Sequence, residues 1–221
     1  MALDRLLAQS GLAVVGHFEP GPQDGLPSAV AHLALIGADG TRMWEVFGKS
    51  AEIHDGAPHP LDRWSERVLS AIAHELGATA CFPFGGPPWQ PFIRWAVRGE
   101  GARPSPVTMQ VSPSRGLWMS YRGALGFPSV QDLPPTATEA PCIGCPAPCL
   151  TACPVGAFSD AGYDVPRCTA HVRSEAGGAC RTGCLVRVAC PAGTPPPLAQ
   201  RKFHMDAFLT AHAPAQVQTG N

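Results

Sequence analysis

The sequence is poor in charged side chains, in tyrosine and in long apolar runs. Only 15% of its 221 residues are Asp, Glu, Lys or Arg, and the formal net charge is −1. A charge so close to zero gives no general affinity for polyanions, so no nucleic-acid partner is expected. No stretch approaches the ~20 apolar residues that cross a bilayer, and the N-terminus shows no basic region followed by an apolar run. We therefore expect a cytoplasmic protein with no membrane partner.

Several common catalytic motifs are missing as well. The chain has no GxGxxG, no Walker A sequence and no G-x-S-x-G, and no Ser/His/Asp or paired-carboxylate arrangement indicates hydrolysis. Glycine (24) and proline (25) instead make up 49 of the 221 residues, well above ordinary usage. This composition predicts many turns and rigid loops.

Cysteine is concentrated in one short region. Eight of the nine cysteines lie between Cys142 and Cys190, in two groups of four that each close on Cys-Pro. Two-cluster bacterial ferredoxins use a similar run, C-x2-C-x2-C-x3-C-P, because close spacing lets one loop offer several thiolates to one metal cube. The pattern predicts two [4Fe–4S] clusters. Their expected ligands are Cys142, Cys145, Cys149, Cys153, Cys168, Cys180, Cys184 and Cys190.

The spacing also departs from the ferredoxin pattern. One extra residue lies between Cys145 and Cys149, and eleven residues separate Cys168 from Cys180. Disulfides are an alternative, but they belong to oxidising compartments. A structural zinc site is another, although four cysteines within twelve residues are dense for one zinc ion.

The residues before the cysteines predict an α+β or α/β layer fold with a mixed sheet, because helical and strand patterns alternate and end in a hairpin. Apolar spacing of three and four residues predicts the clearest helix over 61–76, and Gly77 ends it. The other expected elements are helices over 3–10 and 198–209, strands over 12–18 and 78–82, an apolar run over 30–36, and an antiparallel hairpin of 107–111 with 117–121.

The segment 82–92 combines four prolines and a Gly-Gly pair with four aromatic side chains. Such a segment either packs on the core as a loop or forms one wall of a flat cofactor cavity. Near the first cysteine group, we expect Ile143, Leu150, Val155 and Phe158 to bury the cluster and so help set its potential.

The N-terminal part resembles the cobalamin-processing protein CblC. The resemblance spans roughly 10–135 and rests on His59-Pro60 before a helix, the strand Gly-Leu-Trp118-Met-Ser-Tyr-Arg122-Gly and the Asp132-Leu-Pro-Pro stretch. It implies a nitroreductase-like α+β domain over 1–135 with a mixed sheet, and cobalamin as a candidate cofactor. The corrin would then lie between the aromatic loop and the 117–123 strand, in contact with Phe84, Trp89, Trp118 and Arg122.

The cysteine-rich part is similar to the ferredoxin module of epoxyqueuosine reductase. That resemblance implies a bacterial-ferredoxin-like domain over 136–197, followed over 198–221 by a short helix and a flexible tail. It also implies a crossed ligand set, in which Cys190 joins the first group and Cys153 joins the second. The helical-repeat tRNA-binding domain of that family has no counterpart here.

These observations support three hypotheses about function. The first is an oxidoreductase that takes electrons from reduced ferredoxin or flavodoxin through two clusters and passes them to a bound corrinoid. The second is a ferredoxin-type carrier whose N-terminal domain docks a partner enzyme, with the aromatic loop as the contact patch. The third, from fold analogy alone, is a flavin-binding reductase. A large internal cavity would favour the first over the second.

Overall fold

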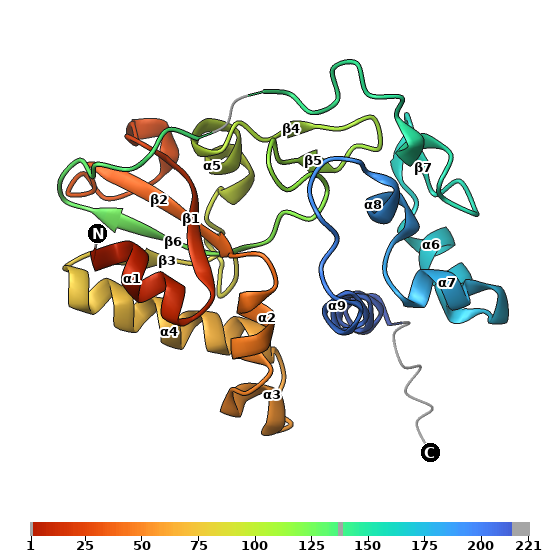
Figure 1. The fold of residues 1–221 in the computed structure, drawn as a ribbon, viewed down its shortest axis with the longest axis horizontal. Helices are drawn as coiled ribbons and strands as arrows, with labels where there is room; N and C mark the ends of the chain where they lie inside the picture. The colour runs from red at the N-terminus through yellow and green to blue at the C-terminus, as the bar shows by residue number, and fades with distance from the viewer. Residues whose placement is uncertain (1, 137–138, 214–221) are drawn as a thin grey trace.

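A computed structural model describes residues 2–136 and 139–213 of the chain. Its main sheet has four strands in the order β1-β2-β6-β3, and helices cover both of its faces (Figure 1). This arrangement confirms the α+β class. The expected mixed sheet is wrong, because all three strand pairings in the sheet are antiparallel.

The described helices and strands follow in chain order. They are α1 (Ala2–Gln9), β1 (Leu12–Phe18), β2 (His32–Ala38), α2 (Arg42–Phe47), α3 (Ala51–His54), α4 (Pro60–Leu76), β3 (Thr79–Cys81), α5 (Phe92–Gly99), β4 (Arg103–Pro104), β5 (Gln110–Val111), β6 (Tyr121–Phe127), β7 (Phe158–Ser159), β8 (Gly162–Tyr163), α6 (Val165–Arg173), α7 (Gly178–Arg181), α8 (Leu185–Ala189) and α9 (Leu198–Ala211).

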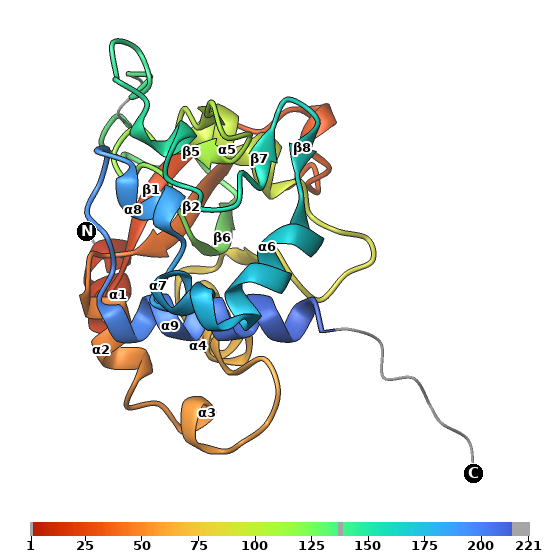
Figure 2. The same cartoon turned by 90° about the vertical axis from the view of Figure 1, so that its right-hand side faces the viewer.

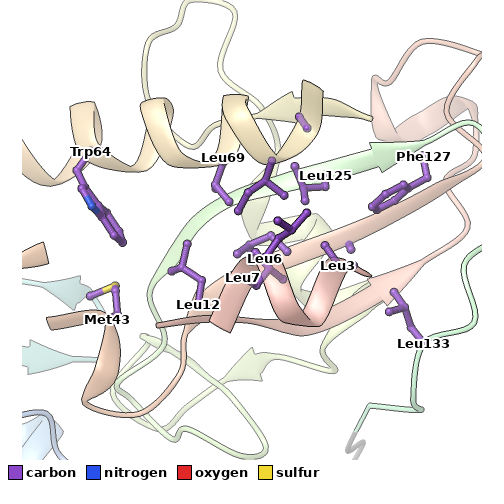
Figure 3. Close-up of a cluster of buried hydrophobic side chains, with 14 of the residues drawn as sticks. Leu3, Leu6, Leu7, Leu12, Met43, Trp64, Leu69, Leu125, Phe127 and Leu133 are labelled. Carbon is purple, nitrogen blue, oxygen red and sulfur yellow. The ribbon is translucent and has the colours of Figure 1, made fainter. Parts of the chain in front are cut away.

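Two apolar layers hold the sheet. Side chains alternate along β2, so that Ile36 lies in the layer with α1 and α4, whereas Leu35 lies in the layer with α5. Because both faces are covered, β2 is buried almost throughout and reads as a continuous apolar run. Figure 3 shows the first layer, where Leu6 and Leu7 of α1 and Leu69 of α4 surround Leu125 of β6.

Most of the strongly patterned elements are confirmed. Helix α4 matches the predicted helix to within one residue, and Gly77 ends it in the left-handed conformation with φ 61°. Strand β1 has the predicted bounds, and α1, β3 and α9 lie where their patterns placed them. The segment between β3 and α5 has no regular structure, as its prolines predict.

The predicted hairpin of 107–111 with 117–121 is wrong. Strand β5 pairs with β4, and residues 117–120 are not a strand. Strand β6 begins at Tyr121 and pairs instead with β2 and β3. Helix α5 was not expected, because Phe92 had been assigned to the preceding aromatic loop.

The cysteine-rich segment forms a separate group of short helices beside the sheet (Figure 1). Helix α9 runs along the side of this group, next to α6 and α7 (Figure 2). It also reaches back to the first apolar layer, where the Phe203 ring lies 5.4 Å from Trp44 and 5.7 Å from Phe47. Helix α9 therefore joins the two parts of the chain, and the tail expected at 214–221 lies outside the described residues.

None of the helices in 2–136 and 139–213 combines the length and apolar character needed to cross a membrane.

Candidate metal centres

Three cysteines of the first run meet Cys190 at one hollow. Cys142, Cys145 and Cys149 line it together with Cys190, and its other walls include Val111 and Leu117 from the N-terminal part of the chain. The four thiols thus come from two distant stretches of sequence.

The other four thiols line a second, larger cavity. Cys153, Cys168, Cys180 and Cys184 share this cavity, which has a volume of about 340 Å³. Cys153 belongs by sequence to the first run, so the chain crosses over between the two sites. This grouping is the one that the resemblance to the reductase module implies, and metal binding itself stays a prediction.

Short helices position the thiols of the second set. Cys168 lies in the first turns of α6, whose N-cap residue Asp164 accepts a hydrogen bond from the Arg167 amide at 2.9 Å. Cys180 lies on α7, and Cys184 precedes α8. A proline in the first turn of α6 fixes φ where the helix needs no donor.

The thiols influence one another electrostatically. Burial raises the pKa of Cys142 and of Cys149, and the other thiols of the same set raise both further. The same causes raise the pKa of Cys180, with Cys184 the largest contributor after burial. Four adjacent thiolates repel one another, so the ionised set would require a positive centre such as a bound metal.

Backbone amides also point at the sulfur atoms. The Ala147 amide donates to the Sγ of Cys145 at 3.4 Å, and the Ala157 amide donates to the Sγ of Cys153 at 3.3 Å. Each thiol set therefore receives backbone hydrogen bonds, and hydrogen bonds to sulfur are among the interactions that set the potential of a bound cluster.

Thiols are the typical metal-binding side chains of the first hollow. None of its described lining residues is His, Asp or Glu, and soft thiolates favour iron–sulfur clusters or zinc. Within 2–136 and 139–213, no three His, Cys, Asp or Glu side chains are placed to hold one metal ion. Iron–sulfur and zinc binding therefore both stay predictions.

The apolar surroundings of the first set differ from those expected. Ile143 is 84% exposed and Leu150 is 59% exposed, so neither buries the site. The buried side chains packed there are Val107, Val111, Leu117 and Val186. Val155 and Phe158 line the larger cavity of the second set instead.

The N-terminal part and the segment after Cys190 are in close backbone contact beside the first thiol set. A Cβ atom added at Gly116, where φ is +56°, would lie 1.8 Å from the carbonyl oxygen of Ala192, two residues after Cys190. The loop that carries Gly116 is held by the buried carboxylate of Glu100, which accepts hydrogen bonds from Arg115 at 2.7 Å and from the Tyr121 hydroxyl. This network fixes the wall against which the first thiol set packs.

The four residues expected to contact a corrin are not brought together. Trp118 and Arg122 line the 340 Å³ cavity, whereas Phe84 and Trp89 do not. Trp89 is 66% exposed, and the Phe84 ring stacks on Phe82 with 5.2 Å between centroids.

The cavity also contains residues that sequence reasoning missed. Gln200, Arg201 and His204 of α9 reach it, as does Arg187 of α8. The sequence gave little indication that these residues line a cavity. Helix α9 has no single apolar face, so its sequence does not show which of its side chains are buried.

Compared with known protein families and with curated proteins, the chain matches none.

Proposed function

We propose that this chain is an iron–sulfur oxidoreductase that carries two [4Fe–4S] clusters and passes low-potential electrons to a small acceptor in the large cavity. One observation supports this most strongly: the eight cysteines fall into two sets of four, and one of these sets lines that cavity. The clusters supply one-electron transfer, and the chain's own residues provide ligation, burial and the space for the acceptor.

The exposure of the two sites suggests a direction for the electrons. The first set lies beside the exposed side chains of Ile143 and Leu150, a surface that a donor protein can cover. Reduced ferredoxin or flavodoxin is the proposed donor. The second set shares its cavity with side chains of β6 and α9, so the acceptor belongs there.

The cavity favours an oxidoreductase over a simple carrier. A carrier needs only an exposed cluster edge and a docking surface, whereas a cavity with converging polar groups is typical of a small-molecule site. The exposed side chains of Trp89, Ile143 and Leu150 suit the carrier hypothesis, and none of them lines this cavity.

The residues expected to contact a corrin are only partly present at this cavity. Trp118 and Arg122 line it, whereas Phe84 and Trp89 do not. A cluster on Cys153 and its partners would share the same space, so we assign no step to cobalt and propose a smaller acceptor. Base-off EPR with saturable binding of cob(II)alamin would restore the corrinoid.

Metal and sulfide analysis of protein prepared without oxygen tests the proposal. Two clusters predict about eight irons and eight sulfides per chain. About four of each would leave one cluster and remove the internal electron path. Zinc alone, without sulfide, would refute the proposal.

A further inference from the structure

Basic side chains line the large cavity together with its thiols, and they are called its basic wall. Arg122, Arg187 and Arg201 line it together with His171 and His204, and no Asp or Glu is among the described lining residues. The nearest acid that pairs with any of them is Asp62, whose carboxylate oxygen lies 3.8 Å from Arg122 Nη1. A single pair at that distance leaves most of the positive charge without a counterion.

The same residues have polar atoms without partners. Eight buried side-chain nitrogen or oxygen atoms in the described residues make no hydrogen bond, and four of them belong to side chains that line this cavity. Three are donors: Trp118 Nε1, Arg122 Nε and Arg201 Nε. The fourth is an acceptor, Oε1 of Gln200, whose residue is only 4% exposed. Unpaired buried groups are costly, so their concentration at one site calls for a ligand.

We propose that this basic wall binds the anionic group of the electron acceptor, a carboxylate or a phosphate, beside the second cluster. The inference rests on the proposed function and adds the chemical class of its substrate. Two guanidinium groups and an indole N–H supply donors to the anion's oxygens. Gln200 would accept a hydrogen bond from a hydroxyl or amino group elsewhere on the ligand.

The apolar wall limits what else the ligand contains. Met109, Met119, Leu185 and Phe208 also line the cavity, so the body of the acceptor is expected to be small and largely apolar. The guanidinium of Arg187 lies 5.9 Å from the centre of the Trp118 ring, a contact that orients both side chains. An inorganic ion would use only the basic half of the site.

The electrostatic surroundings of His204 agree with a net positive cavity. Burial, followed by repulsion from Arg122 and then from Arg187, lowers the pKa of His204 to about 4. The ring is therefore neutral at pH 7 and leaves room for an anion as the balancing charge. A cluster with four thiolates would itself be anionic and would neutralise part of this positive charge.

Anaerobic calorimetry on the cluster-loaded protein tests the proposal, with acetate and inorganic phosphate as probes and sodium chloride as the ionic-strength control. We expect saturable binding of at least one probe and a change in the EPR signal of the reduced second cluster. Arg122→Gln should weaken binding about tenfold or more, because it removes charged hydrogen bonds. Arg122→Lys keeps the positive charge but loses the planar set of guanidinium donors, so its affinity should lie between those of the wild-type protein and Arg122→Gln.

Two further variants keep the test sharp. Arg201→Gln removes an unpaired donor from a different element and covers the case in which Arg122→Gln does not fold. Arg94→Gln changes an exposed arginine on α5 and should leave binding unaltered. Binding that neither cavity variant weakens, or no binding beyond the effect of sodium chloride, would overturn the inference.

Iron analysis of the same samples separates the two proposals. If the iron-loaded protein binds no anion, this inference is wrong and the proposed function still stands. Protein that binds the anion but holds no iron or sulfide loses the proposed function, and with it the acceptor role given to the anion.

Discussion

The crossed arrangement of the cysteines predicts which cluster each cysteine variant will lose. An assignment by chain order predicts the opposite loss. Cys153 is four residues from Cys149 but lines the cavity with Cys168, Cys180 and Cys184. Cys153→Ala should therefore remove the second cluster and spare the first. Cys190→Ala, at the other end of the cysteine-rich region, should remove the first and spare the second.

Double variants show how much iron each assignment predicts. Cys142→Ala with Cys190→Ala removes two thiols of the same set, so about four of the eight irons should remain. Cys142→Ala with Cys153→Ala strikes both sets, so iron should fall to about zero although these cysteines are close in sequence. A sequential assignment, with each run of four making its own cluster, predicts the opposite pattern.

Iron and sulfide content, with EPR of the reduced protein, reads out this comparison. Cys81→Ala is the matched control, because Cys81 is a buried thiol in the layer of α5 and belongs to neither set. It should retain about eight irons. If Cys142→Ala/Cys153→Ala kept half of the iron while Cys142→Ala/Cys190→Ala lost all of it, the crossed assignment would be wrong.

Three other predictions follow from the packing. Gly116→Ala adds a Cβ atom 1.8 Å from the Ala192 oxygen, and we expect it to cost the first cluster, about four irons by metal analysis. Phe203→Ala removes the aromatic contacts of α9 and should lower the free energy of unfolding in urea by ~2–4 kcal/mol. His204 has a folded pKa of about 4 against the usual 6.5, so the unfolded chain binds more protons between these values. Stability should fall by about 1 kcal/mol between pH 7.5 and 5.5, and His204→Gln should remove that loss.

Each of these variants has a matched control. Gly25→Ala has the same left-handed strain, with φ +73°, but open space around the added atom, so it should keep all of its iron. Phe203→Leu retains most of the apolar volume and should cost less than Phe203→Ala. His74→Gln alters an exposed histidine on α4 and should leave the pH dependence unchanged. Equal effects in a variant and its control would contradict the packing argument.

The elements predictable from sequence are those whose pattern reflects one buried face. Helix α4 shows this, since Leu61, Trp64, Leu69 and Ile72 are all buried on its inner side. Helix α5 has an equally regular pattern in Phe92, Trp95, Ala96 and Gly99. It was missed because the prolines before it led to Phe92 being read as part of the loop.

The hairpin failed for a different reason. Val107 and Val111 alternate with polar residues as in a strand, but they are buried because they pack around the first thiol set. A period of two shows that a segment has two sides, and it does not show what lies on the buried side. Only the tertiary structure reveals that the partner is a group of cysteines.

The candidate site was predictable only in part. Cysteine spacing indicates the eight thiols because the metal chemistry restricts both residue type and separation. The basic wall follows no such rule, because Trp118, Arg122 and Arg201 are distant in sequence and meet only in the folded chain, where they line one cavity. The aromatic loop attracted attention for its composition, yet Trp89 lies outside the cavity.

The backbone contact between Gly116 and Ala192 has a consequence for how this protein can be divided. A boundary near residue 135 separates two sequence resemblances, but the hollow of the first thiol set takes Val111 and Leu117 from one side and Cys190 from the other. A fragment of 136–197 would keep all eight thiols and lose four of the twelve residues that line the first site. The cysteine-rich segment therefore cannot be transferred to another protein on its own. The recipient would need a surface shaped like the loop that carries Gly116.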